Sequence, residues 1–125
     1  MPDKRDIVRA KVAKASEFLV HADFAVSEKA WDVACSLSAS AAINASDALI
    51  VALGGAIPSR EEHAGAVRTL SQLADANAGR QLTAALKTKS KSQYEISSCT
   101  ESNAQAAFKA AERLVTRAKE MDSNE

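Results

Sequence analysis

Residues 31–53 have the sequence WDVACSLSASAAINASDALIVAL, and they predict one long helix at the centre of a helical protein. Apolar residues recur along this stretch at steps of three, four or seven, as one face of a helix requires. This face comprises Trp31, Cys35, Ala39, Ile43, Ile50 and Leu53. Most of the positions between them are Ala or Ser, small side chains that let neighbouring helices approach closely. We expect this helix to span about residues 28–53 and to end at Gly54 and Gly55, because glycine readily adopts the left-handed conformation that ends helices.

Four further helices are predicted, at about residues 4–26, 59–79, 80–93 and 100–120. Each carries apolar residues every three or four positions, and no segment has the alternation typical of a strand. Asp3 and Thr100 are expected N-caps, and Ser59-x-x-Glu62 forms a capping box. Short links between antiparallel helices favour an up-and-down arrangement. The sequence therefore predicts an all-α fold, an up-and-down bundle of about five helices.

Length and composition indicate one domain over residues 1–125, with ends that fray at about residues 1–3 and 121–125. Sixteen basic and 16 acidic residues give a formal net charge of zero, so any contact with nucleic acid would need a local basic patch. The beginning of the chain, MPDKRDIVRAK, is too polar for a signal peptide, and no apolar run approaches the ~20 residues of a membrane span. We expect a cytoplasmic protein that contacts no membrane.

The two cysteines form neither a CxxC motif nor a cluster of metal ligands. Cys35 falls on the apolar face of the central helix, so we expect a buried free thiol. We expect no metal and no cofactor.

Polar residues interrupt three of the apolar helical faces. Asp47 lies three residues before Ile50 and four after Ile43, which places it on the inner face of the central helix, bordered by Asn44. Three more polar residues follow on later helices: His63, Lys89 and Tyr94. Two interpretations stay open. In one, Asp47 pairs with Lys89 or His63, Tyr94 donates a hydrogen bond, and the network only fixes helix register. In the other, the carboxylate orients His63 and a lysine binds an anion.

Residues 80–94 carry four cations and no acid: Arg80, Lys87, Lys89 and Lys91. Cations suit the C-terminal end of a helix, so this stretch could be a solvated helix end. The alternative is a strip that contacts phosphate or RNA. Arg60, in the first turn of its predicted helix, opposes the helix dipole and is expected to have a partner.

Four segments together resemble the HEPN family of small helical domains. They are NASDALIVALGG (44–55), SREEHAGAVRTL (59–70), LKTKSKSQYE (86–95) and ESNAQAAFKAAERLV (101–115). The resemblance covers nearly the whole chain and implies a core of four bundled helices. In one subgroup an Asp, a His, a Lys and a Tyr recur in this order, and here they are Asp47, His63, Lys89 and Tyr94.

The resemblance also implies function. HEPN domains include metal-independent ribonucleases, in which four to six residues separate an Arg from the His that follows it. Here the required positions hold Lys14, Ala15 and Ser16 before His21, and Ala56, Ile57 and Pro58 before His63, so the motif is absent. Other members are binding or accessory modules, and many form dimers.

Our first hypothesis is a non-catalytic domain in a toxin–antitoxin, defence or stress system. It would bind a nucleotide, an RNA or an operon-encoded protein partner, and would form a homodimer. Asp47, His63, Lys89, Tyr94 and Asn44 would line its site, and Arg60, Lys87 and Lys91 would add charge. The alternatives are a divergent ribonuclease toxin that uses His63 as general acid or base, and a structural dimerisation adapter.

Overall fold

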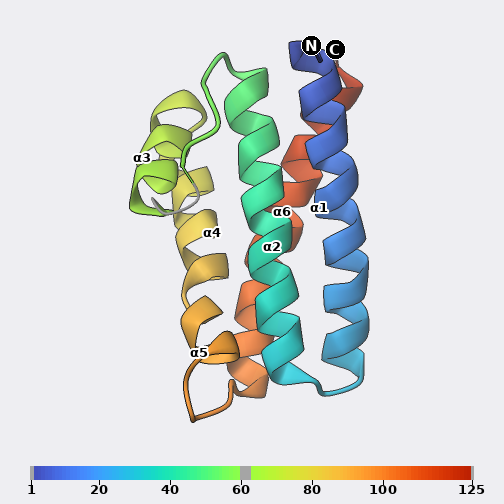
Figure 1. Cartoon of the computed structure of the whole chain (residues 1–125), viewed down its shortest axis with the longest axis vertical. Helices are drawn as coiled ribbons and strands as arrows, with labels where there is room; N and C mark the ends of the chain where they lie inside the picture. Colours follow the sequence, from blue (N-terminus) through green and yellow to red (C-terminus); the bar gives the residue numbers. More distant parts are fainter. Residues whose placement is uncertain (1, 60–62, 125) are drawn as a thin grey trace.

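The computed structural model describes residues 2–59 and 63–124, and within them the chain is all-α, as the sequence predicts (Figure 1). The helices are α1 (Lys4–Ser27), α2 (Trp31–Ala52), α3 (His63–Leu73), α4 (Ala76–Leu86), α5 (Lys89–Gln93) and α6 (Glu101–Ser123). The described residues thus form six helices rather than about five, because the helix expected at 80–93 is divided between α4 and α5.

Helix α2 is the centre of the bundle. It packs against each of the other five helices, with α1 and α6 along its length and the shorter α3, α4 and α5 on its other side (Figure 1). Ala41, Ala42 and Ala45 are fully buried. Alanine at these positions lets the long helices come close together, which explains why the stretch that predicts the fold is rich in small residues. Gly54 ends the helix region with a φ of 94°, the left-handed conformation expected there.

The apolar character of α2 also passes a simple test for a membrane span. Of the helices described, it is the one that is long and apolar enough, with 22 residues and a mean hydropathy of 1.3. The prediction that no apolar run approaches the length of a membrane span is therefore wrong, since α2 meets that test by length and composition. In the bundle, 61% of the apolar window is buried against other helices, which accounts for its hydropathy.

The boundary between α3 and α4 differs from the sequence prediction. Gly79 was expected to end the third helix, but α4 begins at Ala76 and includes it. Asp75 caps α4 by accepting a hydrogen bond from the Ala78 amide at 2.8 Å. A Cβ at Gly79 would collide with the Ser71 side chain. The glycine therefore allows α3 and α4 to cross closely, and the turn between them consists of Ala74 and Asp75 alone.

Two of the expected caps are confirmed. Asp3 and Asp6 exchange hydrogen bonds between side chain and backbone at the start of α1, and Thr100 does the same with Asn103 at the start of α6. Glu62 of the third expected cap lies outside the described residues.

Cys35 is a buried free thiol, as expected, and Cys99 is also buried and free. Burial raises the pKa of the Cys99 thiol to about 12. The Cys99 amide donates to the Asp32 carboxylate at 2.7 Å, which ties the segment before α6 to the first turn of α2. This hydrogen bond holds the pKa of Asp32 below its usual range.

Candidate functional site

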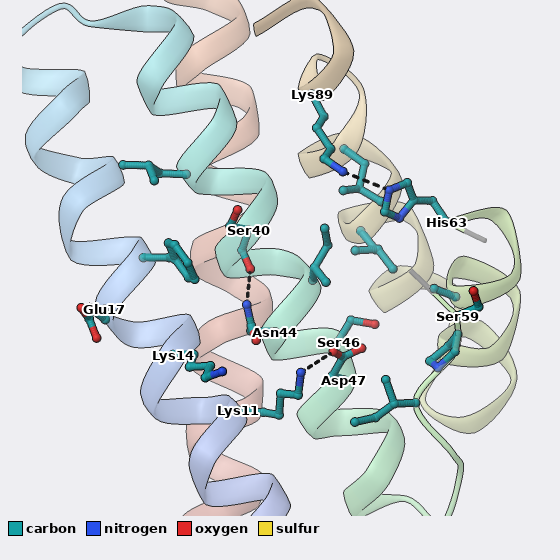
Figure 2. Close-up of a pocket in the computed structure, with 18 of the residues that line it drawn as sticks. Lys11, Lys14, Glu17, Ser40, Asn44, Ser46, Asp47, Ser59, His63 and Lys89 are labelled. Carbon is teal, nitrogen blue, oxygen red and sulfur yellow. Dashed lines mark hydrogen bonds and ion pairs between the residues drawn. The ribbon is translucent and has the colours of Figure 1, made fainter. Parts of the chain in front are cut away.

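A cavity of about 1010 Å³ opens between α1 and α2 on one side and α3, α4 and α5 on the other (Figure 2). Its charged residues are Lys11, Lys14, Glu17, Asp47 and Lys89, and its two histidines are His21 and His63. Its apolar residues include Phe18, Leu37, Ile43, Ile57, Ala66, Leu82 and Leu86. The volume is at the upper end of the range typical of small-molecule sites.

Helix α1 supplies its share of the wall by simple periodicity. Lys11, Lys14, Phe18 and His21 follow one another at steps of three, four and three residues, so they share one face of the helix. Lys11 and Lys14 extend from this face toward α2 in Figure 2.

Lys11 and Asp47 form an ion pair across the α1–α2 contact. The Lys11 Nζ lies 3.1 Å from the Asp47 Oδ2, and the two side chains are 21% and 12% exposed. A carboxylate this buried is costly without a cation nearby. The sequence hypothesis gave Asp47 the partners Lys89 or His63, and the structure instead gives it Lys11 of α1.

His63 and Lys89 form a second pair on the opposite side of the cavity (Figure 2). The Lys89 Nζ lies 3.3 Å from the His63 Nε2. Partial burial, and then the positive charge of Lys89, lower the pKa of His63 from its ordinary value of 6.5. The imidazole is therefore mainly neutral at pH 7, and its Nε2 can accept a hydrogen bond from the ammonium group.

The α2 wall carries an unused hydroxyl. Ser46 is 2% exposed and lines the cavity, and its Oγ has no hydrogen-bond partner within the described part of the chain. Asn44 also lines the cavity, and its side-chain amide donates to the Ser40 carbonyl of the same helix at 2.9 Å. Because a buried hydroxyl without a partner is unfavourable, Ser46 is suited to receive a hydrogen bond from, or donate one to, a bound molecule.

Comparison with known proteins decides the family. The family model of the HEPN domain matches residues 8–121. The chain belongs to the HEPN family. No curated protein matches it. The matched region of this HEPN domain includes every residue that lines the cavity.

The structure brings together half of the residues that the sequence predicted for the site of this HEPN domain. Four of them line the cavity: Asn44, Asp47, His63 and Lys89. Asp47 and Asn44 lie on α2, where Asp47 pairs with Lys11, and His63 pairs with Lys89 on the opposite side, so the four residues do not form one continuous row. Arg60 lies outside the described residues.

Tyr94, Lys87 and Lys91 do not line the cavity. Tyr94 follows the end of α5, where its side chain is 81% exposed. The interpretation in which Tyr94 donates a hydrogen bond to a core network is therefore wrong. The division between α4 and α5 explains the error. Helix α4 ends at Leu86, and in the short α5 that follows, Lys89 still lines the cavity while Tyr94 comes after the last helical residue.

Sequence reasoning missed Lys11, Lys14, Phe18 and Ser46. A signal for Lys11 was present, because it lies three residues after Val8 and four before Ala15, two buried positions of α1. Ser46 had no distinguishing signal among the many serines of α2.

The chemistry available in the cavity of the HEPN domain favours binding of an anion. Among the residues that the structure describes, three lysines face it against two carboxylates, Glu17 and Asp47, and one of the lysines is already paired. Within the described residues, no group of three or more His, Cys, Asp or Glu side chains is placed to hold a metal ion.

Proposed function

We propose that this HEPN domain is a binding module whose cavity takes a nucleotide. The observation that carries the proposal is the mixed chemistry of the cavity wall. Apolar side chains of α1, α2 and α4 line it together with lysines from α1 and α5. A nucleotide has two matching parts, a flat apolar base and an anionic phosphate group.

The base would contact the apolar part of the cavity lining formed by Phe18, Leu82 and Leu86. Leu82 is buried, and Phe18 and Leu86 are partly buried against the main core, so their surfaces are held in place. Stacking of a base on an aromatic ring contributes about 1–3 kcal/mol and tolerates different bases. The unpartnered Ser46 hydroxyl in the same wall would then satisfy a polar atom of the ligand.

Lys14 and Lys89 lie on opposite sides of the cavity, and each supports a separate position for the phosphate (Figure 2). Lys11 is engaged with Asp47, whereas Lys14 forms no ion pair with any residue that the structure describes. Within the described residues, the Lys89 Nζ forms a polar contact only with the mainly neutral His63 imidazole. Charge-assisted hydrogen bonds to phosphate are among the stronger polar contacts of proteins.

Calorimetric titration with AMP, ATP, GMP, UMP, adenosine and inorganic phosphate tests the proposal. We expect at least one nucleotide to bind, and to bind at least about tenfold more tightly than its nucleoside or phosphate alone, since both parts of the cavity must contribute. Lys14→Gln should weaken binding about tenfold, while Lys4→Gln, an exposed lysine of α1 outside the cavity, should not. Absence of binding by every nucleotide at millimolar concentration would overturn the proposal.

His63 and Lys89 favour one second candidate, metal-independent cleavage of RNA. A mainly neutral imidazole could accept a proton while the adjacent ammonium stabilises a developing phosphate charge. Incubation of the protein with total RNA in EDTA, beside His63→Ala, tests it. Cleavage that disappears with His63→Ala would support the enzyme, and no cleavage by either protein would remove it.

The remaining expectations stay predictions: a homodimer, an operon-encoded partner, a role in a toxin–antitoxin or defence system, a structural adapter role, and a cytoplasmic location without membrane contact.

A further inference from the structure

A second hollow lies on the other side of α4, between α4 and α6. It has a volume of about 600 Å³. Its lining residues come from these two helices alone: Asn77, Arg80, Gln81, Ala84, Ala106, Lys109, Ala110 and Arg113. We call it the α4–α6 groove. It shares no lining residue with the cavity, which α4 meets through Leu82 and Leu86.

The groove is built from two matched helical faces. The four residues from α4 and the four from α6 each follow the spacing i, i+3, i+4 and i+7, so each set forms one continuous stripe about two turns long. Ala84, Ala106 and Ala110 provide the small apolar side chains of the groove, and the longer polar side chains accompany them. A groove with an alanine floor admits the side-chain ridge of another helix.

The groove is strongly cationic, although the chain as a whole has no net charge. Arg80, Lys109 and Arg113 line it, and no Asp or Glu among the described residues does. None of the three forms an ion pair within residues 2–59 and 63–124, and Arg80 hydrogen-bonds only to Asn77 of its own helix at 3.1 Å. Arg117, one turn further along α6, is different, since its guanidinium binds Asp75 at 3.0 Å.

One polar atom in the groove also lacks a partner. The Gln81 Oε1 is buried, and no donor within the described chain reaches it. A carbonyl oxygen needs an N–H or O–H donor, and polar side chains of a protein partner offer one.

We propose that the α4–α6 groove docks an acidic amphipathic helix of a partner protein. The helix would place small apolar residues on the alanine floor and carboxylates against the three cations, with arginine able to bind a carboxylate through two parallel hydrogen bonds. A single RNA strand fits less well, because the groove has no aromatic side chain for base stacking within the described part of the chain and its floor is apolar. This inference does not depend on what the cavity binds.

Fluorescence anisotropy with a designed peptide tests the proposal. The probe is a fluorescein-labelled helical peptide of roughly 20 residues, long enough to be helical in isolation, with an Ala stripe flanked by Glu at i, i+3, i+4 and i+7. A control peptide of the same sequence has Gln at every Glu position. We expect the Glu peptide to bind at least about tenfold more tightly than the Gln peptide.

Two kinds of variant locate the binding. Arg80→Glu with Arg113→Glu should reduce affinity for the Glu peptide at least about tenfold, whereas Arg9→Glu with Lys119→Glu, which makes the same charge change at exposed positions outside the groove, should leave it nearly unchanged. Ala106→Leu keeps every charge but fills the floor, and because Ala106 is exposed we expect it to fold normally and still to lose the peptide. Circular dichroism checks the fold of each variant.

Three results would overturn the proposal. The first is failure of the Glu peptide to bind at low salt. The second is an equal loss in the groove variant and the matched control, which would indicate attraction to overall charge. The third is tighter binding of a single-stranded oligouridylate that the groove variant alone abolishes, which would assign the groove to RNA.

Discussion

The Lys11 Nζ lies 3.1 Å from the Asp47 Oδ2 and joins α1 to α2 at the wall of the cavity. This pair replaces the partners that the sequence suggested for Asp47. Lys89 and His63 instead contact each other on the opposite side of the cavity, with 3.3 Å between Nζ and Nε2. The polar residues of this HEPN domain are therefore arranged as two pairs that face a shared space, which is the arrangement of a site that a ligand could enter.

The Asp47 carboxylate should contribute to stability through its ion pair. Asp47→Ala leaves the partly buried Lys11 ammonium without this carboxylate. We expect the free energy of unfolding to fall by about 2–3 kcal/mol, less than for a fully buried pair. Urea denaturation followed by circular dichroism measures it. Glu17→Ala, an exposed carboxylate at the same cavity, should change stability by less than about 0.5 kcal/mol. Equal small effects of both substitutions would show that the pair contributes nothing.

Ser46 and Ser38 form a natural comparison on α2. Both are almost fully buried, at 2% and 0% exposed, and neither hydroxyl has a partner in the described chain. Replacement of either by Ala should raise the free energy of unfolding by about 1 kcal/mol, because it removes an unsatisfied polar group. Only Ser46 lines the cavity, so only Ser46→Ala should also weaken the nucleotide found by titration. Equal affinities for the two variants would exclude Ser46 as a ligand contact.

His63 should make stability depend on pH. Its pKa is lowered in the folded chain by burial and by Lys89, so the unfolded chain binds more protons in the pH range just below 6.5. Stability contributed by His63 is then complete above pH 6.5 and is lost as the pH falls through this range toward the folded pKa. NMR titration of the imidazole should give a midpoint below 6.5, with the signal assigned by its loss in His63→Gln. A midpoint at or above 6.5 would contradict the contact with Lys89.

The close packing of α2 should not tolerate larger side chains. Ala45 is fully buried, so Ala45→Leu should lower the free energy of unfolding by about 1–3 kcal/mol or more, because the helices must separate. Ala10→Leu adds the same atoms at an exposed position of α1 and should be nearly neutral. Thermal unfolding of both proteins separates the effect of packing from that of hydrophobicity. Similar melting temperatures would indicate that α2 has room beside it.

Most of the helical architecture follows from local sequence. Periodic apolar residues predicted α1 and α2 to within a few residues, and Asp3 and Thr100 predicted where α1 and α6 begin. These features depend on contacts within one or two turns, which neighbouring residues determine. The division between α4 and α5 was missed, as was the role of Gly79. Gly79 is required by its approach to Ser71 of another helix, and local sequence carries no information about that distance.

The candidate site shows the same contrast between what local sequence predicts and what tertiary contacts decide. By itself, the sequence determined that Asp47 faces inward, because its spacing from Ile43 and Ile50 fixes its direction on α2. Only the tertiary structure decided that Lys11 pairs with Asp47 and that Lys89 pairs with His63. Which lysine is close enough depends on which helices are neighbours and on how they are aligned along their axes. The tertiary structure also separates Tyr94 from the cavity, since it follows the last residue of α5, whereas Lys89, the first residue of the same short helix, still lines the cavity.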